Sequence, residues 1–224
     1  MDFTKRIAAM APEGLQRELR RVHYHLQILK GTFVTGEPEF KRLAEWVKPG
    51  DWVIDVGANV GHYTHRLSEL VGRQGRVISF EPVPETFADL TSNSRLSKFD
   101  NITLVNAAAS DKTTVVGMSM PTLPTGLKNY SEASIDSAPE VSAQSVLTLS
   151  IDSLKLEHRI SLIKIDAEGH EPFVLRGLRK LLERDTPTLI VETVTEEVRT
   201  LLLGLGYAEE RMPHSPNFVF SAPR

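Results

Sequence analysis

The segment DWVIDVGANVGHYTHRLSELVG, residues 51–72, joins a short apolar run, a turn containing glycines and an amphipathic helical pattern. The run ends at Asp55, and Gly57 and Gly61 stand in the turn. Apolar residues then recur at helical spacing until Gly72. In doubly wound α/β folds, a turn between a buried strand and a helix is where the nucleotide binds. The segment therefore predicts the first strand–helix unit of an α/β sheet.

The alternation of strand and helix continues along the chain. A helix is predicted over residues 171–183, and buried strands are predicted in RVISFEP (76–82), NITLVNAAAS (101–110), SLIKID (161–166) and TPTLIVETV (186–194). Parallel strands need crossover connections, so this pattern indicates βαβ units and a parallel sheet. The last two predicted strands, in GYAEERM and NFVFSA, are separated by a short turn and are expected to form an antiparallel pair.

Two other parts of the chain do not follow this alternation. Residues 1–48 carry apolar residues at helical spacing and are predicted to form an N-terminal helical extension to a main domain over residues 49–224. Within that domain, residues 111–150 contain two predicted strands joined by a long loop rich in Ser, Thr, Pro and Gly. We interpret this segment as an inserted hairpin, with a loop of a length that is usually functional or disordered.

The composition excludes several classes of function. The 224 residues include no cysteine, which excludes disulfides, thiolate metal sites and cysteine nucleophiles. A formal net charge of −3 gives no basic excess for nucleic acid, so no nucleic-acid partner is expected. No apolar run is long enough for membrane insertion, and the N-terminus has no apolar core of the kind that secretory signals carry. We expect a cytoplasmic protein.

The glycine turn and one acidic residue restrict the ligand. A dinucleotide fingerprint reads GxGxxG, whereas this turn has Asn59 in the second glycine position and His62 in the third, which argues against NAD and FAD. Glu81 ends the second predicted strand, where a carboxylate can accept both hydrogen bonds of a ribose diol. Asp55 would repel a pyrophosphate and attract a sulfonium. A ribose with a positive charge and no phosphate describes S-adenosylmethionine.

Four ordered blocks, VIDVGANVGHYT, FEPVPETFADLTSN, NITLVNAAASD and IKIDAEGHE, resemble the FkbM family of S-adenosylmethionine-dependent methyltransferases. The resemblance runs from about Gly36 to Glu192. It implies a Rossmann-like class I methyltransferase fold, with a seven-stranded, mostly parallel sheet in the order 3-2-1-4-5-7-6. It also implies methyl transfer, mostly to hydroxyl oxygens of small molecules such as sugars and secondary metabolites.

The resemblance also implies a set of cofactor-binding residues. The turn after the first strand would hold the methionine part, Glu81 the ribose, and the segment after the third strand would border the adenine. A glutamate before the first strand is common in the family, and Glu37 stands in the matching place. The full set is Glu37, Asp55, Gly57, Ala58, Asn59, Gly61, Glu81, Asn106, Ala107 and Asp111.

IKIDAEGHE, residues 163–171, supplies the candidates for chemistry. Asp166, Glu168 and His170 are predicted to be catalytic, because a fourth strand beside the first would end at the ligand crevice. His170 has the side-chain pKa nearest neutrality and is the natural general base, but Asp166 or Glu168 could remove the proton instead and leave the imidazole to orient the acceptor. Glu171 is better explained by the start of a helix.

Three questions remain open at this stage. The acidic residues of IKIDAEGHE and His170 are acceptable ligands for a divalent ion, but their spacing specifies no metal site, and a metal is not favoured. Glu192, which ends LIVET, either faces the crevice or is a solvent-facing strand end. The alternatives to a methyltransferase are a dinucleotide-dependent oxidoreductase and a non-catalytic S-adenosylmethionine-binding module.

The partners follow from the same reasoning. The acceptor is expected to be a small hydroxylated molecule, chosen by the N-terminal helices and the loop over residues 121–145, which the fold itself does not require. The N-terminal helices are also a candidate surface for a homo-oligomer.

Overall fold

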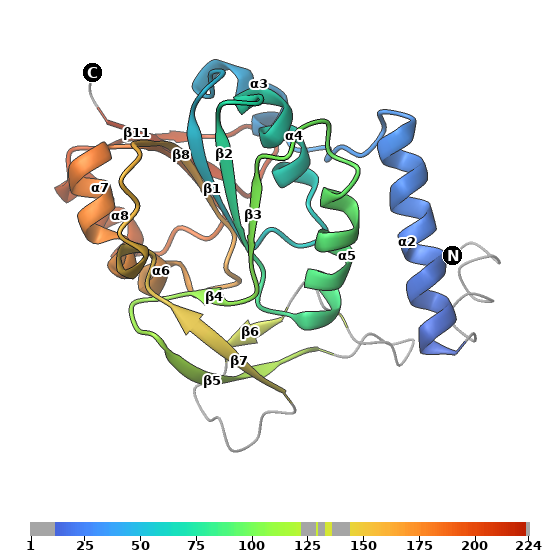
Figure 1. Ribbon diagram of the computed structural model, residues 1–224. Coiled ribbons are helices and arrows are strands. Elements are labelled where there is room, and N and C mark those ends of the chain that lie inside the picture. Colours follow the sequence, from blue (N-terminus) through green and yellow to red (C-terminus); the bar gives the residue numbers. More distant parts are fainter. Residues whose placement is uncertain (1–11, 122–128, 130–132, 136–143, 223–224) are drawn as a thin grey trace.

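The computed structural model describes residues 12–121, 129, 133–135 and 144–222, and a seven-stranded sheet forms its centre (Figure 1). The sheet has the spatial order β10-β11-β9-β8-β1-β2-β3. Counted along the chain within this sheet alone, that order is the predicted 3-2-1-4-5-7-6. Its strands are β1 (Trp52–Val56), β2 (Arg76–Phe80), β3 (Ile102–Val105), β8 (Ile160–Ile165), β9 (Thr188–Val191), β10 (Ala208–Arg211) and β11 (Phe218–Ser221).

Strand direction in this sheet follows the connections. The pairs β1–β2, β1–β8, β2–β3 and β8–β9 are parallel. The pairs β9–β11 and β10–β11 are antiparallel, as the short turn between the last two strands predicts. The carboxyl ends of β1, β2, β8 and β9 therefore meet at one edge of the sheet.

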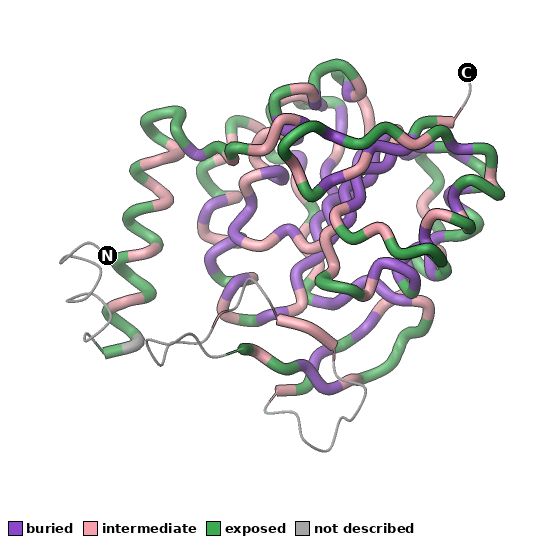
Figure 2. Tube along the Cα trace, turned by 180° about the vertical axis from the view of Figure 1, so that it is seen from behind, coloured by how far each residue is buried: buried purple, intermediate pink, exposed green. Residues whose placement is uncertain are grey.

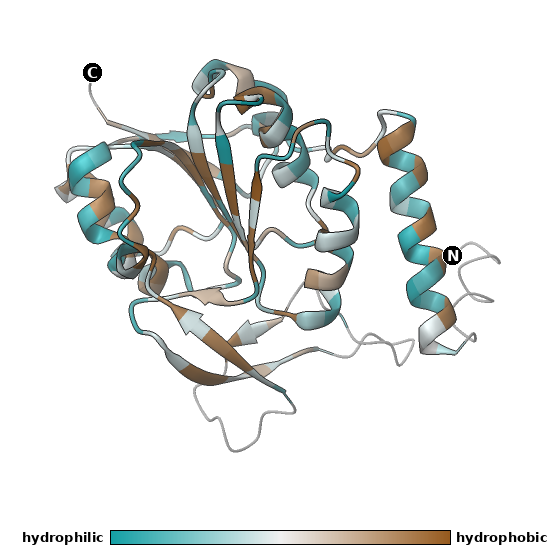
Figure 3. Cartoon of the chain, viewed as in Figure 1, coloured by the Kyte–Doolittle hydropathy of each residue, from teal (hydrophilic) through white to brown (hydrophobic). Residues whose placement is uncertain are grey.

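Helices cover both faces of the sheet, and each face has its own apolar core. One core joins the sheet to α6 (Glu171–Gly177), α7 (Arg179–Asp185) and α8 (Glu196–Gly204). The other joins it to α3 (Pro38–Trp46) and α4 (His62–Val71), and α5 (Pro84–Ser94) lies beside α4. The central strands are mostly buried (Figure 2) and apolar (Figure 3). Burial on two faces explains their nearly continuous apolar sequences.

The helix predicted over residues 171–183 is two helices. The chain leaves helical geometry at Leu178, whose φ is −124° and ψ is 19°. Gly177 just before it lies against the backbone of Ser110. The new start at α7 is stabilised by Asp152, whose carboxylate accepts hydrogen bonds from the Lys180 and Leu181 amides. Asp152 thus caps α7 although it lies 28 and 29 residues before these two amides in the sequence.

The insertion is larger than the predicted hairpin. β5 (Thr114–Ser119) and β7 (Gln144–Leu149) form the expected antiparallel pair, but β6 (Ser134–Ile135) and β4 (Ala108–Ala109) extend it to a four-stranded sheet with the order β4-β7-β5-β6. The predicted third strand therefore contributes to two sheets, since β3 ends at Val105 and β4 pairs parallel to β7. Residues 122–128, 130–132 and 136–143 of the predicted loop lie outside the described residues. A 3-10 helix, Ile151–Leu154, leads from β7 toward β8.

The first described helix, α2 (Glu13–Leu29), lies at one side of the molecule against α5 (Figure 1). Arg20 forms an ion pair with Asp89 at 2.8 Å, and His25 is 2.9 Å from the Ser92 hydroxyl. The side of α2 that faces away from α5 carries an exposed apolar stripe, which consists of Leu15, Leu19, Val22, Leu26 and Leu29. Among the described helices, none combines the length and apolar content needed to cross a lipid bilayer.

Candidate active site

A cavity of about 580 Å³ opens where the parallel strands of the main sheet end. β1 leads into its floor at Gly57, β2 contributes Glu81, and β8 contributes Asp166. Met118 on β5 and Ile135 on β6 line it from the small sheet. The position agrees with the rule that ligands of open α/β sheets bind at the carboxyl ends of the strands.

The turn after β1 is shaped by close backbone contacts. Gly57 has φ +71°, and a Cβ atom there would lie 1.8 Å from the backbone oxygen of Asp166. Only glycine therefore fits between β1 and the segment after β8. Asn59 is also left-handed, with φ +50°, and Gly61 has φ +100° immediately before α4. The turn brings Gly57 and Asn59 to the cavity wall and buries Ala58 and Gly61 behind it.

Glu81 is fixed at the cavity wall by two backbone donors. The Asn59 amide donates to Oε2 at 2.9 Å, and the Val83 amide donates to Oε1 at 2.9 Å. Burial raises the pKa of Glu81 to about 7, although both amide hydrogen bonds oppose the shift. Each carboxylate oxygen keeps a free lone pair, so the group can accept hydrogen bonds from two adjacent hydroxyls. The residue is suited to the ribose role that was predicted for it.

Asp55 does not line the cavity, contrary to the prediction of a direct cofactor contact. It is fully buried beneath the turn, where Oδ2 accepts a hydrogen bond of 2.6 Å from Thr64. Strand alternation explains this position, because Val56 lines the cavity and the side chain of Asp55 points to the opposite face of β1. Its charge acts on Lys164 of β8 and raises the pKa of that ammonium, together with Asp166, against the effect of burial.

The remaining predicted cofactor residues are spread over several positions. Ala107 is buried in the cavity wall. Asn106 is exposed, and its amide donates to the backbone oxygens of Glu81 and Pro82, so it holds the loop after β2. Asp111 lies outside this cavity and pairs with Arg176 at 3.5 Å. Glu37 precedes α3 and accepts a hydrogen bond from Thr35, also outside the cavity lining.

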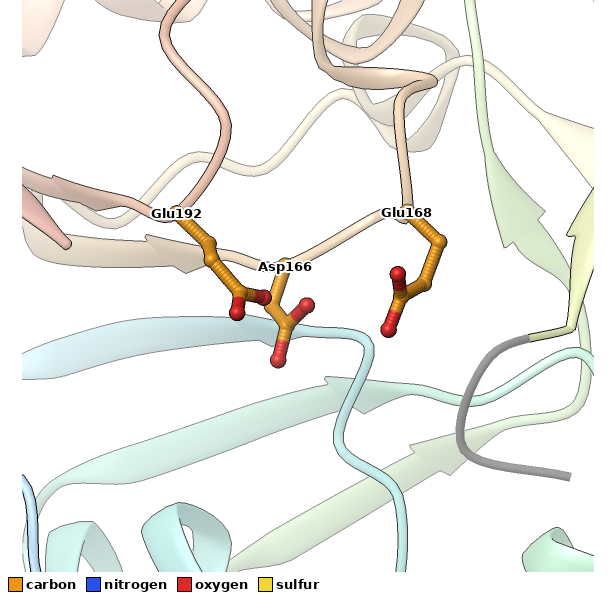
Figure 4. A group of neighbouring side chains, drawn as sticks. All are labelled: Asp166, Glu168 and Glu192. Carbon is orange, nitrogen blue, oxygen red and sulfur yellow. The ribbon is translucent and has the colours of Figure 1, made fainter. Parts of the chain in front are cut away.

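An ion pair and a pair of carboxyl groups lie at the ends of β8 and β9, and Figure 4 shows the carboxyl groups of Asp166 and Glu192. The Lys164 ammonium lies 2.7 Å from Asp166 Oδ2, and only 5% of Lys164 is exposed. Asp166 also shares a side-chain hydrogen bond with Glu192. Burial would raise the pKa of Asp166, but Lys164 and Glu192 lower it, whereas the hydrogen bond with Asp166 and burial raise the pKa of Glu192 to about 8.

Sequence reasoning missed Lys164 and did not choose between the two roles of Glu192. Lys164 stands two residues before Asp166, a spacing that places both side chains on one face of a strand. A lysine within an otherwise apolar buried strand is the signal that could have identified it. Glu192 required the strand order, because it lies beside Asp166 only when β9 is next to β8.

Glu168 faces the carboxyl pair from the following turn (Figure 4). It has φ +48°, and Gly169 after it has φ +90°. Carboxylate oxygens of Asp166, Glu168 and Glu192 all lie within 4.8 Å of one another, a spacing that a divalent ion could bridge. The Lys164 ammonium beside Asp166 offsets part of the negative charge of this group.

His170 lies on the other side of the turn, away from the carboxyl pair. Its Nε2 is 2.9 Å from the Ser110 hydroxyl, and its ring stacks on Phe173 with centroids 4.4 Å apart. Burial lowers the pKa of His170, and the negative charge of Asp111 acts in the opposite direction. Glu171 is fully buried and accepts hydrogen bonds from the Ala167 and Gly169 amides, so its expected role at the helix start is confirmed.

A second cavity, of about 910 Å³, adjoins the first. Glu168, His170 and Ile135 line both, so these residues mark the junction. The second cavity is otherwise formed by the small sheet, including Thr114 and Thr148, and by the segment after β4. Its wall is partly polar and contains hydroxyl, carboxylate and ammonium groups. The arrangement provides two adjoining cavities with ionisable groups at their boundary.

Comparison with known proteins agrees with this geometry. Residues 55–208 match the family model described as the methyltransferase FkbM domain. The curated proteins include no match. Among solved structures, the methyltransferase FkbM from Methylobacillus flagellatus is similar, with a TM-score of 0.56 and 18% identity. That alignment covers 97% of this chain and 57% of the other chain.

Two more distant enzymes share the fold. Fibrillarin from Aeropyrum pernix, solved with natively bound S-adenosyl-L-methionine, has a TM-score of 0.50 and 18% identity over 79% of this chain and 68% of its own. An rRNA methylase from Streptococcus thermophilus has a TM-score of 0.50 and 13% identity over 81% and 92%. These likenesses establish the Rossmann-like fold of class I methyltransferases. Because the family match spans more than half of the sequence, the chain belongs to the FkbM methyltransferase family.

Proposed function

We propose that this protein transfers a methyl group from S-adenosylmethionine to a hydroxyl oxygen of a small acceptor such as a sugar or secondary metabolite. The observation that carries the proposal is the pair of adjoining cavities with Glu168 and His170 at their junction. Family membership supports methyl transfer, and the hydroxyl and charged side chains in the wall of the second cavity support a small hydroxylated acceptor.

The first cavity fits the donor. Glu81 would accept the two ribose hydroxyls, since its carboxylate is already oriented by two amides. The turn at Gly57 and Asn59 would surround the methionine part, and the apolar wall at Val83 and Ala107 would border the adenine. When bound, S-adenosylmethionine supplies a methyl group on a positively charged sulfur, which is a good leaving group. The protein's own task is to orient the acceptor and to remove its hydroxyl proton.

The second cavity is the proposed acceptor site. An acceptor there would approach the donor past Glu168 and His170, and Asp166 lines the first cavity on the donor side of that boundary. Ser110 and Phe173 hold the His170 ring in place, which suits a group that orients a hydroxyl. The wall contributed by β5, β6 and β7 comes from the insertion, so we expect the insertion to select the acceptor.

The proposal is tested in two stages. Calorimetry would first compare S-adenosylhomocysteine with NAD; binding of the former and not the latter is expected, and the reverse result would support an oxidoreductase. A panel of sugars and other hydroxylated compounds would then be screened for release of S-adenosylhomocysteine. Donor binding without turnover on any acceptor would instead support a non-catalytic binding module.

We also propose that α2 pairs with α2 of a second copy. Its exposed stripe, Leu15, Leu19, Val22, Leu26 and Leu29, has spacings of four, three, four and three, the heptad pattern of a coiled-coil seam. Between 47% and 74% of each of these residues is exposed. Glu18 and His23 flank the stripe at positions that face each other in a parallel pair. Because of this repeat, the stripe on α2 can pack against the same stripe on a second copy of the protein.

A further inference from the structure

The carboxyl groups of Asp166 and Glu192 hydrogen-bond to each other at the end of two neighbouring parallel strands. An ionised carboxylate can only accept a hydrogen bond, so a bond between two carboxyl groups requires that one of them is protonated. Figure 4 shows the two side chains lying side by side, with Glu168 turned toward them. The free protein therefore holds one proton in this pair, as closely spaced carboxyl groups do in other enzymes.

The charges around the pair explain which group carries the proton. From β8, Lys164 contacts Asp166 and keeps that carboxylate ionised. Asp55 on β1 and Glu37 before α3 act on Lys164, and Glu168 in the turn adds negative charge near Glu192. Glu192 has no ammonium of its own in contact within the described residues. The proton consequently resides on Glu192, which is close to the ionised Asp166 and to the negative charge of Glu168.

Asp166 lines the cavity at the end where the donor's sulfur is expected, whereas Glu192, its partner, is not part of the cavity lining. The backbone oxygen of Asp166 lies against Gly57, in the turn proposed to surround the methionine part, and Glu81 is proposed to bind the ribose. In the donor molecule the sulfur connects those two parts. A positive charge placed between them would lie near Asp166 and favour ionisation of its partner.

We propose that Asp166 and Glu192 hold one proton in the free protein, release it when the sulfonium donor binds, and take up the acceptor's hydroxyl proton during methyl transfer. This inference rests on the proposed function. The charge of the site is then the same before and after donor binding, because one positive charge enters as one proton leaves.

The transfer step balances in the same way. The carbon–sulfur bond breaks, the carbon–oxygen bond forms, and the acceptor's O–H bond breaks as its proton passes to the ionised pair. The sulfonium becomes a neutral thioether, and the pair again carries one proton. The products are therefore an ether, a neutral thioether and a carboxyl pair that holds one proton, as in the free protein. In this scheme His170 orients the acceptor, and Glu192, through its pair with Asp166, is the proton acceptor.

Donor and product binding test the inference without any acceptor. Isothermal titration calorimetry would be run at pH 7.0 in phosphate and in imidazole buffer, which differ in ionisation enthalpy, so the protons released on binding can be counted. With a pKa of about 8, Glu192 is about nine-tenths protonated at this pH. S-adenosylmethionine should release up to about 0.9 proton more than neutral S-adenosylhomocysteine, because any proton that Glu81 releases on ribose binding is common to both ligands.

The pH dependence of affinity is a second measurement. Between pH 6 and pH 7 the Kd of S-adenosylmethionine should fall more steeply than that of S-adenosylhomocysteine, by up to about tenfold in their ratio, because ionisation of Glu81 affects both ligands alike. Glu192→Gln should abolish the difference between the two ligands, both in proton release and in pH dependence. Glu157→Gln makes the same chemical change at an exposed position and should behave like the wild type.

The outcomes separate this inference from the proposed function. Equal proton release by the two ligands in the wild type would overturn the inference while leaving donor binding intact. Loss of the signal in Glu168→Gln but not in Glu192→Gln would also overturn it, by assigning the proton elsewhere. Absence of binding by either ligand would contradict the proposed function itself. The wild-type comparison remains decisive even if Glu192→Gln does not fold.

Discussion

At the scale of single residues, the site shows that local sequence predicts a residue's place at a strand end better than its contacts. Glu81 lies where its position after the second strand predicted, in the wall of the cavity. Asp55 lies beneath the turn, because its side chain alternates away from the ligand. Lys164 and Glu192 act only through neighbours on adjacent strands. Their contacts depend on sheet order, which no stretch of local sequence contains.

Residue-scale electrostatics predict how stability changes with pH. Glu192 has a folded-state pKa of about 8, above the ordinary value of 4.5, so its contribution to stability is fully present below pH 4.5 and is lost as the pH rises through 8. Glu192→Gln should therefore lose less stability than the wild type between pH 5 and pH 8 in urea denaturation. Burial of Glu81 acts in the same direction, with a pKa of about 7, and remains in the variant.

Glu157→Gln is the matched control, because Glu157 is exposed and should leave the wild-type slope unchanged. A Glu192→Gln protein whose stability falls with pH as steeply as that of the wild type would show that Glu192 is not held protonated by the fold.

At the scale of elements, periodicity in the sequence indicated the strands and helices. It did not indicate the places where an element ends because of a contact with residues far away in the sequence. Periodicity continues through Leu178, so one helix was predicted where α6 and α7 are separate. Likewise, the predicted third strand reads as continuous, yet Ala108 and Ala109 pair with β7 of the second sheet. In both places a contact with distant residues decides the geometry.

Two helix-terminal glycines test this reasoning at the junction of α6 and β4. A Cβ at Gly177 would lie 1.8 Å from the backbone oxygen of Ser110, so Gly177→Ala must displace backbone and should destabilise the protein by at least about 1–3 kcal/mol. Gly204 also ends a helix but has open space around it, so Gly204→Ala should be neutral or stabilising by up to about 1 kcal/mol.

Urea denaturation of both variants measures these effects. Equal stabilities of the two variants would contradict the close packing of α6 against the segment after β4. Because Ser110 also contacts His170, the destabilised variant should lose part of the order at the cavity junction.

At the scale of the whole molecule, the order of the main sheet was predictable, because the family resemblance specifies it and the strand–helix alternation agrees with it. The second sheet was not, since two of its strands contain only two residues each and have no periodicity to detect. The proximity of the small sheet to the carboxyl ends of the main sheet creates the boundary between the two cavities.

Self-association through α2 is the prediction that belongs to this scale. The double variant Leu19→Lys, Leu26→Lys places charges in the exposed stripe and should shift the protein toward monomer in sedimentation equilibrium. Leu203→Lys is the control, because Leu203 is similarly exposed on α8 and lies outside the stripe. A wild type that sediments as a monomer across the concentration range would contradict the proposed pairing.

The central claim is that the cavity at the strand ends binds S-adenosylmethionine with Glu81 on its ribose. The most direct measurement is the Kd of S-adenosylhomocysteine for the wild type and for Glu81→Gln, determined by calorimetry with folding checked by circular dichroism. Loss of a charge-assisted hydrogen bond of about 1.5–3 kcal/mol predicts binding that is weaker by roughly 10- to 150-fold in a folded variant. Unchanged affinity in the folded Glu81→Gln protein would contradict the account.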